Sequence, residues 1–361
     1  MSQLQAGPLS ASTEIPLHAP EAMLKRICAY FEEYCEVRFE GGVGQIVADF
    51  GTATLQAGDS TLSLKASAGN ETGLAYVKLS LAEHILSFAA PEAPRIIWTG
   101  DGSAGQPLPY FREMRVVRVV DVTPHMRRLT LSGDRLESFA TGGFHIRLLI
   151  PPKDVTPIWP VTGEDGRPSW PDSADRPIVR IYTMRRIDVE NGEVDVDFVM
   201  HEGEDMPGTG FAARAQAGDI VGMTGPGGGS IGEADWYLLA GDETALPAIG
   251  RILETLPETA RGVALIEISE ATEEQPLKRP SGFEVRWLYR KNAQAGTTTL
   301  LQDAVSAVEW PTDGSKLFAW AGCEHESFKA IRRYLRNERK MAREDHLVVA
   351  YWRRDARQGE E

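Results

Sequence analysis

The spacing of apolar residues changes near residue 230, and this change constrains the fold more than any other feature of the sequence. Before it, short stretches alternate between apolar and polar residues, most regularly over 193–200. Such alternation is typical of half-buried strands. After it, apolar runs such as 236–240 are followed by segments with helical spacing. Because strands that alternate with helices form mainly parallel α/β sheets, we predict a strand-rich domain followed by an α/β domain.

Six short strands are predicted in the first of these domains. Many short strands at this spacing form a sandwich or a barrel, and we predict an antiparallel β-barrel over residues 111–230. The Pro- and Trp-rich segment 153–177, between the third and fourth strands, is expected to be a surface excursion. The predicted strands cover residues 114–121, 126–131, 144–150, 178–185, 193–200 and 219–223.

The second domain is predicted to be an α/β domain with a mainly parallel sheet over residues 231–361. A barrel followed by an α/β domain is the architecture of flavin reductases, in which the barrel holds FAD and the second domain binds the nicotinamide. This order of domains suggests a flavoprotein, and the sequence motifs test that interpretation. The predicted strands are 236–240, 263–268, 284–289, 317–321 and 346–352, and the predicted helices are 243–256 and 325–340.

The region before the barrel is predicted to hold a small α+β domain at residues 21–90, between a flexible arm (1–20) and a linker (91–110). The arm is polar and contains Pro, and the linker is rich in Pro and Gly. Within the domain, two segments with helical spacing enclose two alternating stretches. The predicted helices cover 23–34 and 74–88, and the predicted strands cover 45–50 and 61–65.

Composition and charge argue against several classes of protein. A net charge of −14 does not suit a nucleic-acid binder or a binder of anionic membranes. No apolar run reaches the roughly 18 residues that span a bilayer, so we expect no membrane insertion. The three cysteines are too few for a disulfide framework, and their spacing suits no metal site. The first 20 residues lack the pattern of an export signal, and we expect a cytoplasmic protein.

The run Arg180-Ile-Tyr-Thr-Met-Arg185 carries the strongest chemical signal. A flavin site needs an aromatic ring over the isoalloxazine, a hydroxyl near N5 and a guanidinium for the pyrophosphate. Tyr182, Thr183 and Arg180 supply these groups, and Tyr182 and Thr183 are the candidate catalytic residues. Along a strand, Arg180 and Tyr182 point to one face and Thr183 to the other. A barrel strand with incidental charges explains the same run, so both interpretations remain open.

Two further motifs combine a turn with the start of a helix. A Gly- and Pro-containing loop precedes a helix predicted at 211–217, and helix N-termini expose N–H groups that bind phosphate. The run Gly241-Asp-Glu-Thr-Ala-Leu-Pro-Ala-Ile249 follows a buried strand, and Asp242 or Thr244 can cap the next helix. Each motif is equally explained by a connection that binds nothing. No Gly-x-Gly-x-x-Gly is present, so we predict no conventional dinucleotide fingerprint.

Over residues 111–356 these motifs resemble those of siderophore-interacting proteins. The run Gly241–Ile249 is close to a signature of that family. Residues 144–149 resemble its His-Val-Lys-Leu strand, and residues 350–354 resemble its Gly-Tyr-Trp-Arg ending. The loop 201–212 departs from the family's His-Gly-x-Gly-Pro and Trp-Ala pattern, because Gly203 comes one place late and Phe211 replaces Trp. The N-terminal segment resembles a small bacterial domain of unassigned function that is sometimes fused ahead of this family.

The resemblance implies an FAD-dependent oxidoreductase that reduces ferric siderophores and releases Fe(II), with NADPH, NADH or reduced ferredoxin as donor. The iron stays with its chelator, so no metal ligands are predicted. An anionic chelate needs local positive charge, which Arg147, Arg185, Arg353 and Arg354 are expected to supply, with Arg186 as a further candidate. The candidate cofactor-binding residues are His145, Arg180, Tyr182, Thr183, His201, Thr209, Gly210, Phe211, Gly241, Asp242, Thr244, Ala245 and Trp352.

Two alternatives keep the same fold. In the first, the chain is an NAD(P)H:flavin or ferredoxin oxidoreductase whose acceptor is not a siderophore. In the second, it is a siderophore-binding module in which FAD is structural. Turnover with ferric chelates, compared with flavin or dye acceptors, separates these alternatives from siderophore reduction.

Overall fold

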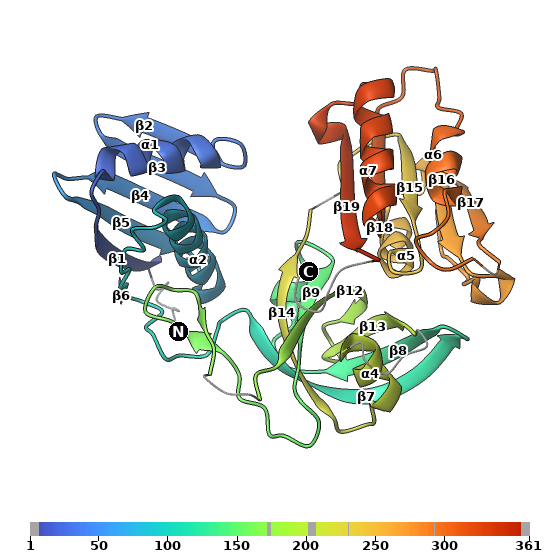
Figure 1. Cartoon of the computed structure of the whole chain (residues 1–361), viewed down its shortest axis with the longest axis horizontal. Helices are drawn as coiled ribbons and strands as arrows, with labels where there is room; N and C mark the ends of the chain where they lie inside the picture. The colour runs from blue at the N-terminus through green and yellow to red at the C-terminus, as the bar shows by residue number, and fades with distance from the viewer. Residues whose placement is uncertain (1–6, 172–174, 201–206, 230, 292, 355–361) are drawn as a thin grey trace, which may run out of the picture. The chain divides into compact units, whose positions relative to one another are not determined.

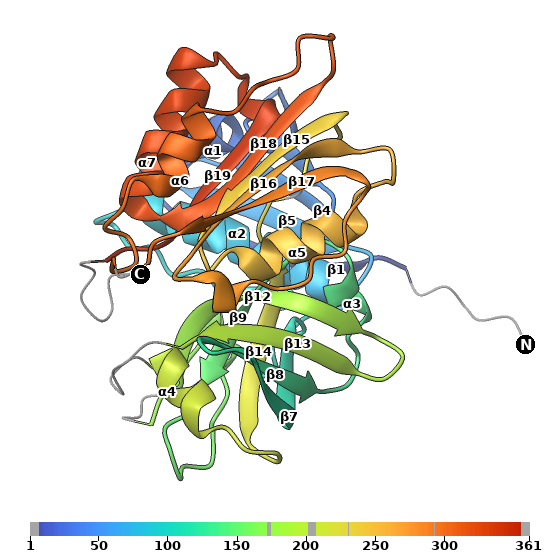
Figure 2. The same cartoon turned by 90° about the vertical axis from the view of Figure 1, so that its right-hand side faces the viewer.

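The structure of the chain, a computed structural model, describes residues 7–171, 175–200, 207–229, 231–291 and 293–354. It divides into two compact units. The first unit holds Met1–Phe111 with Pro152–Pro177, and the second holds Arg112–Pro151 with Ile178–Glu361. Figure 1 and Figure 2 follow the chain in colour from its blue N-terminus to its red C-terminus.

A six-stranded antiparallel sheet and two helices form most of the first unit, in the strand order β2-β3-β4-β5-β1-β6. The apolar residues of both helices join one core with alternate strand residues. Asn70 caps the second helix, because its side chain accepts a hydrogen bond from the Gly73 N–H at 2.8 Å. The predicted α+β domain is thereby confirmed. Its elements are β1 (Leu9–Pro16), α1 (Pro20–Phe31), β2 (Glu36–Glu40), β3 (Val43–Ala48), β4 (Gly51–Ala57), β5 (Thr61–Ala68), α2 (Glu71–Phe88) and β6 (Thr99–Gly100).

The N-terminal arm differs from the prediction, because residues 9–16 form β1 inside this sheet. This strand pairs with β5 on one side and with β6 on the other. Ala11, Thr13 and Ile15 are buried, and the residues between them are exposed. This alternation was present in the sequence, but the polar composition of the segment concealed it. The predicted linker also contributes β6 and the buried Trp98 to the same unit.

The Pro- and Trp-rich segment between β9 and β12 belongs to the first unit. It contains a small hairpin of β10 (Val161–Thr162) and β11 (Pro168–Ser169). The Trp98 ring N–H donates to the Asp165 carbonyl at 3.0 Å, and the Thr162 N–H donates to the Gln106 carbonyl at 2.8 Å. The segment is therefore an integral part of the first unit, which two separate stretches of chain build together.

A closed six-stranded barrel opens the second unit, in the order β12-β13-β8-β7-β14-β9. Alternate side chains such as Leu129, Met184, Val196 and Phe198 fill its interior. All six strands fall where the sequence predicted them, and the short helix α4 begins four residues earlier than predicted. The elements are β7 (Phe111–Thr123), β8 (Met126–Ser132), α3 (Glu137–Ala140), β9 (His145–Ile150), β12 (Ile178–Asp188), β13 (Glu193–Val199), α4 (Pro207–Arg214) and β14 (Ile220–Gly227).

A five-stranded parallel sheet follows, in the order β17-β16-β15-β18-β19. One helix, α5, packs on one face, and α6 and α7 pack on the other, as Figure 2 shows. The predicted α/β domain is confirmed, although α6 was not foreseen. The elements are β15 (Trp236–Gly241), α5 (Leu246–Thr255), β16 (Arg261–Ile268), β17 (Gly282–Tyr289), α6 (Leu300–Ser306), β18 (Leu317–Glu324), α7 (His325–Arg333), which continues as a π-helical turn (Tyr334–Glu338), and β19 (His346–Trp352).

None of the helices in the described parts of the chain is long and apolar enough to cross a membrane.

Candidate functional site

Strands β9 and β12 pair antiparallel and bring three of the predicted site residues together around Ile181. Thr183 lies opposite His145, and Ile181 lies opposite Arg147. Directly opposed residues point to the same face of a sheet, so these four side chains share the outer face of the barrel. Ile181 is 65% exposed there, whereas Thr183 is buried. The outer face therefore combines an exposed apolar side chain with a hydroxyl, an imidazole and a guanidinium.

Tyr182 lies on the opposite face of β12, as the alternation predicted. Its ring packs against Phe198 of the barrel core, with the ring centroids 4.3 Å apart. Its hydroxyl reaches the first turn of α4, where a Cβ added to Gly208 would lie 1.9 Å from the hydroxyl oxygen. Only glycine fits this contact. Tyr182 is thus fixed between the barrel core and the start of α4.

Helix α4 carries three of the predicted phosphate contacts. The Thr209 hydroxyl donates to the Val199 carbonyl at 3.3 Å, and Gly210 is half-buried. Phe211 is buried in the barrel core, with its ring centroid 6.3 Å from that of Phe198. Its aromatic ring therefore anchors the helix to the barrel core. His201 lies outside the described residues.

Asp242 joins the turn after β15 to the ends of two other parallel strands. Its buried carboxylate accepts hydrogen bonds from the Thr244 N–H (2.9 Å) and the Thr244 hydroxyl (2.5 Å). It also accepts from the Trp352 ring N–H at 2.8 Å and from the Glu324 N–H at 3.2 Å. Burial raises the pKa of Asp242, and the bonds from Thr244 and Trp352 oppose this rise. Three predicted site residues thus meet here, and Asp242 orders the carboxyl edge of the sheet.

Gly241 and Ala245 complete this turn. A Cβ added to Gly241 would lie 2.6 Å from the Ala245 Cβ and 2.8 Å from the Gly322 carbonyl oxygen. The glycine therefore allows the turn to pass close to β18. Ala245 is fully buried, so its side chain packs within the domain.

A buried ion cluster at the same edge was missed by the sequence analysis. Arg290 forms two bonds to the Glu243 carboxylate and approaches Glu267 at 3.5 Å. All three side chains are nearly inaccessible, at 5% for Arg290 and 11% and 7% for the carboxylates. Burial raises the pKa of Glu267, and the Arg290 charge opposes this rise. The positions of these residues in the sequence could have revealed the cluster, because each of the three lies at or just after the carboxyl end of a parallel strand.

The predicted substrate arginines have different surroundings. Arg147 is exposed on the outer face of the barrel. Arg353 contacts the His325 ring at 3.1 Å, and Arg354 donates to the Gly296 carbonyl at 2.9 Å. Arg185 forms an ion pair with Glu254 of α5 at 2.7 Å. Arg186 forms ion pairs with the carboxylates of Asp188, Glu193 and Asp195. Arg185 therefore connects the barrel to the α/β domain, and a substrate would have to compete with that ion pair.

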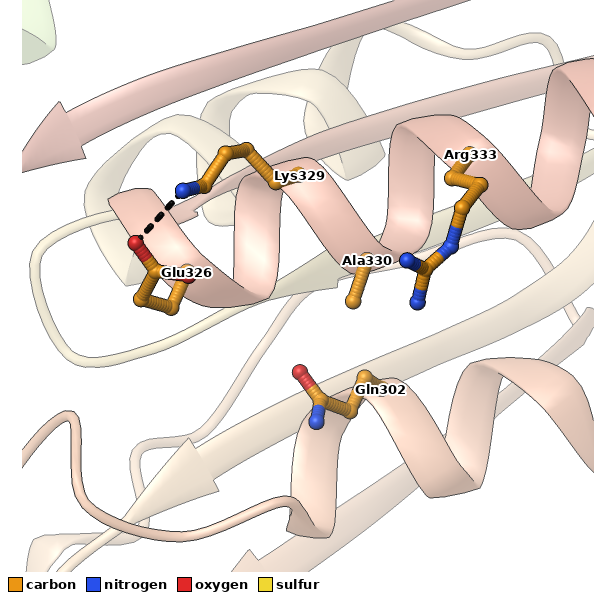
Figure 3. Close-up of a pocket in the computed structure, with 5 residues that line it drawn as sticks. All are labelled: Gln302, Glu326, Lys329, Ala330 and Arg333. Carbon is orange, nitrogen blue, oxygen red and sulfur yellow. Dashed lines mark ion pairs between the residues drawn. The ribbon is translucent and has the colours of Figure 1, made fainter.

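No metal cluster is found among the described residues of the site, and the pocket between α6 and α7 lies elsewhere. The described residues contain no group of three or more His, Cys, Asp or Glu side chains that could hold a metal ion. A cavity of about 380 Å³ lies between α6 and α7, where Gln302 faces Ala330 and Arg333 (Figure 3). An ion pair between Glu326 and Lys329, at 2.7 Å, borders it. No predicted site residue lines this cavity.

Three protein families match the chain in sequence. Residues 115–230 match the siderophore-interacting FAD-binding domain, and residues 234–355 match the siderophore-interacting protein family. Residues 12–99 match a family described as an uncharacterized protein conserved in bacteria. Together, the first two matches cover the barrel and the parallel sheet.

Relatives and solved structures agree with these matches. Ferric vibriobactin reductase ViuB of Vibrio cholerae is 34% identical over 249 residues, which is 68% of this chain and 90% of that protein. The NADPH-dependent ferric-chelate reductase of Escherichia coli K12 is 30% identical, over 67% of this chain and 92% of that protein. The crystal structure of a siderophore utilization protein from T. fusca is 38% identical, with a TM-score of 0.58, over 68% of this chain and 94% of that one.

Proposed function

The chain belongs to the siderophore-interacting protein family, and on this premise we propose that it is an FAD-dependent oxidoreductase that reduces ferric siderophores. The observation that carries the proposal is the outer face of β9 and β12, where Thr183, His145 and Arg147 surround the exposed Ile181. Reduction weakens the hold of a siderophore on iron, because such chelators bind Fe(III) far more tightly than Fe(II). One NADPH carries two electrons, so each turnover reduces two ferric chelates.

The residues of this face fit FAD. The isoalloxazine ring is flat and apolar with polar edges, and a solvent-exposed isoleucine such as Ile181 is a suitable surface for it. The Thr183 hydroxyl and the His145 ring supply hydrogen-bonding groups beside it, and Arg180 and the first turn of α4 supply groups that bind phosphate. Bound FAD would accept electrons in pairs and release them singly to ferric iron.

We assign roles to this chain's residues on that basis. Arg180 and the N–H groups near Thr209 and Gly210 bind the pyrophosphate. Tyr182 holds the start of α4 in place, and Thr183 offers its hydroxyl to the reacting edge of the ring. Gly241, Asp242 and Trp352 shape the carboxyl edge of the parallel sheet, where the nicotinamide is expected to bind.

The ferric siderophore is expected to bind through exposed cations near the same edge. The protein carries a net charge of −14, so an anionic chelate requires a local positive region. Arg147 on the barrel and Arg353 and Arg354 at the end of β19 are the arginines we assign to it. The iron keeps its chelator ligands until it is reduced, so the protein supplies charge and proximity and no metal ligands.

NADPH is the donor we favour, with NADH and reduced ferredoxin as the other candidates, since the Escherichia coli relative is NADPH-dependent. A reducing, nucleotide-rich compartment suits this reaction, and we therefore propose a cytoplasmic location. The three cysteines of the chain are free thiols, which accords with that compartment.

Anaerobic titration tests the proposal. The FAD-loaded protein is reduced with NADPH or NADH and then mixed with a panel of ferric siderophores. The absorption band of oxidised flavin, at about 450 nm, is followed during the reaction. We expect reoxidation with two chelates per flavin and formation of Fe(II). Faster reoxidation by dyes or free flavin than by any chelate would favour an oxidoreductase with another acceptor. A bound flavin that no donor reduces would favour a siderophore-binding module.

Replacing Arg180 and Tyr182 together with alanine should weaken FAD binding by about 100-fold. This estimate combines a charge-assisted hydrogen bond, worth roughly 1.5–3 kcal/mol, with a lost aromatic contact of about 1 kcal/mol. Fluorescence titration of the apoprotein with FAD measures the change. Arg118→Ala, an exposed arginine on β7, is the control and should leave FAD affinity unchanged. Equal losses in both variants would contradict the role of β12.

Replacing Arg147 with glutamate should raise the KM for anionic ferric chelates by about tenfold, the effect of roughly 1.4 kcal/mol of lost electrostatic attraction. The kcat with an uncharged acceptor should not change, because Arg147 lies outside the barrel core. Lys316→Glu makes the same charge change beside the amino end of β18 and is the control. If the two variants raise the KM equally, the net charge and not the local surface governs binding.

A further inference from the structure

Strand β2 leaves one edge of the sheet in the first unit open. It is the outer strand of that sheet, and Figure 1 shows it at the rim of the blue ribbon. The sheet ends on its other side with β6, a strand of only two residues. Exposed edges are commonly protected by short length, proline or a bulge, but β2 is five residues long, contains no proline and pairs with β3 without a bulge. The effect of its charges therefore depends on the strand that it meets.

The hairpin of β2 and β3 determines which backbone groups of β2 point toward the open edge. Glu40 and its partner on β3 close the two-residue turn Gly41–Gly42, whose φ values are 59° and 77°. In such hairpins the closing residues exchange hydrogen bonds, and hydrogen-bonded pairs then alternate with non-bonded pairs along the ladder. The N–H and C=O groups of Phe39 and Val37 therefore point away from β3, toward the open edge.

The charges of β2 complement a second copy of the same strand. The sequence of β2 is Glu36-Val-Arg-Phe-Glu40. In an antiparallel pair centred on Val37, Glu36 of each copy lies directly opposite Arg38 of the other. Opposite charges that face each other across two strands stabilise the pair, and like charges destabilise it. A pair centred on Arg38 would instead set Arg38 opposite Arg38 and Glu36 opposite Glu40, so charge disfavours that register.

The backbone favours the same register. In the pair centred on Val37, the outward groups of Val37 meet each other, and those of Phe39 meet Cys35. All of these residues lie before the glycine turn. A pair centred on Phe39 also matches opposite charges, but it sets Val37 opposite Gly41, where the chain already turns with a positive φ of 59°. Backbone and charge together therefore select the register centred on Val37.

Exposed aromatic side chains lie beside this edge. Phe39 is 43% exposed, and Tyr34, in the turn before β2, is 59% exposed. Val37 and Cys35 pack against the core of the first unit, and Phe39 lies on the same face of the strand. In the pair centred on Val37, each Phe39 lies opposite Cys35 of the other copy and next to its Tyr34. Aromatic rings of this kind are enriched where proteins meet.

We propose that two copies of the chain associate through β2, paired antiparallel about Val37, so that their two six-stranded sheets join into one. The contact is symmetric, because each copy contributes the same strand. Each Arg38 already binds Glu36 of its own strand, at 2.6 Å, and gains Glu36 of the second copy as another partner. The first unit thereby acts as a dimerisation module, and this role does not depend on the proposed reaction.

Sedimentation velocity of the full-length protein tests the proposal. We expect the wild type to form dimers, and Arg38→Glu to raise the Kd of the dimer about tenfold, because two pairs of opposite charge become pairs of like charge. Arg95→Glu makes the same charge change at another exposed arginine of the first unit and should leave the Kd unchanged. A wild type that stays monomeric at about 100 μM, or a dimer that Arg38→Glu does not weaken, would overturn the inference.

Two double variants of equal net charge test the register. Adding Glu36→Arg to Arg38→Glu exchanges the charges of each facing pair and should restore the dimer. Adding Glu40→Arg to Arg38→Glu should not restore it, because position 40 lies opposite Tyr34 in this register. All three positions are exposed, so the fold of the first unit should persist, which circular dichroism checks. Restoration by Glu40→Arg, or no restoration by Glu36→Arg, would contradict the proposed pairing.

Hydrogen exchange tests the edge directly in the wild-type chain. The N–H groups of Val37 and Phe39 should exchange more slowly with solvent when the protein concentration is raised above the Kd, because they then bond to the second copy. Those of Glu36 and Arg38 already face β3 and should change little. Exchange at Val37 and Phe39 that is independent of concentration would rule out pairing through β2.

Discussion

Replacing Arg290 with leucine should lower the free energy of unfolding of the α/β domain by about 3–5 kcal/mol, the cost of removing one partner from a buried ion pair. Arg290 is 5% exposed and is bonded to Glu243, with Glu267 beside it. Leucine leaves two buried carboxylates facing each other, close to Asp242. Urea denaturation followed by circular dichroism measures the loss.

The loss should come from unpaired charge, and two further variants show whether it does. In the Arg290→Leu background, Glu243→Gln and Glu267→Gln together should restore most of the stability, because neutral amides need no counter-ion. Arg286→Leu removes an arginine from the neighbouring β17, where its pair with Glu284 is exposed, and should cost less than about 1 kcal/mol. An Arg290→Leu variant as stable as Arg286→Leu would contradict the argument.

The strands were predictable because their signal is local. Residues 193–198 alternate between acidic and apolar side chains, and β13 (Glu193–Val199) includes all of them. The apolar runs that became β15, β16 and β18 are continuous, as expected for parallel strands buried on both faces. The edge strand β2 carries no buried residue, and the inner strand β4 carries two, Ala53 and Leu55; neither strand gave a comparable pattern.

Contacts between distant segments were not predictable in this way. In the sequence, the segment that forms the hairpin of β10 and β11 is polar and rich in Pro, which predicts a surface excursion. Its hydrogen bonds to Trp98 and Gln106 show instead that it completes the first unit. Glu273 is similar, because it follows β16 and yet accepts hydrogen bonds from Thr123 (2.5 Å) and His125 (2.7 Å) in the barrel. Each pairing joins residues far apart in sequence, for which spacing carries no information.

Around the candidate site, the sequence predicted the strand faces of single residues, but not the contacts between segments. The alternation along β12 correctly separated Tyr182 from Thr183. The predicted contact residues Asp242 and Phe211 proved to be buried, because a turn or helix that presents backbone groups to a ligand must itself be anchored. The contact of Tyr351 with His145 could not be predicted from the motif that contains Tyr351, since His145 lies 206 residues earlier, on a barrel strand.

Replacing Phe198 with alanine should destabilise the barrel by about 3–5 kcal/mol, as other large core truncations do. It should also abolish the binding of FAD at micromolar concentrations of the cofactor. Phe198 is fully buried on β13, between the rings of Tyr182 and Phe211. Its removal leaves a cavity beneath both the strand that carries Thr183 and the helix that carries Thr209 and Gly210. The two halves of the proposed cofactor site would then lose their common support.

A smaller change at Phe198 distinguishes the proposed support of the cofactor site by this ring from its contribution to the stability of the barrel. Phe198→Leu keeps most of the apolar volume and should cost about 1–2 kcal/mol, with FAD affinity reduced only a few-fold. Val116→Ala, at a fully buried residue of β7, should cost a similar amount, about 1–2 kcal/mol, and keeps the Phe198 ring in place. If FAD affinity followed stability alone, Phe198→Leu and Val116→Ala would weaken it equally. We expect the larger loss at Phe198, because its ring packs against both Tyr182 of β12 and Phe211 of α4. Under the proposed function, packing in the barrel core would therefore set the spacing between the groups proposed to hold the flavin and those proposed to hold its pyrophosphate.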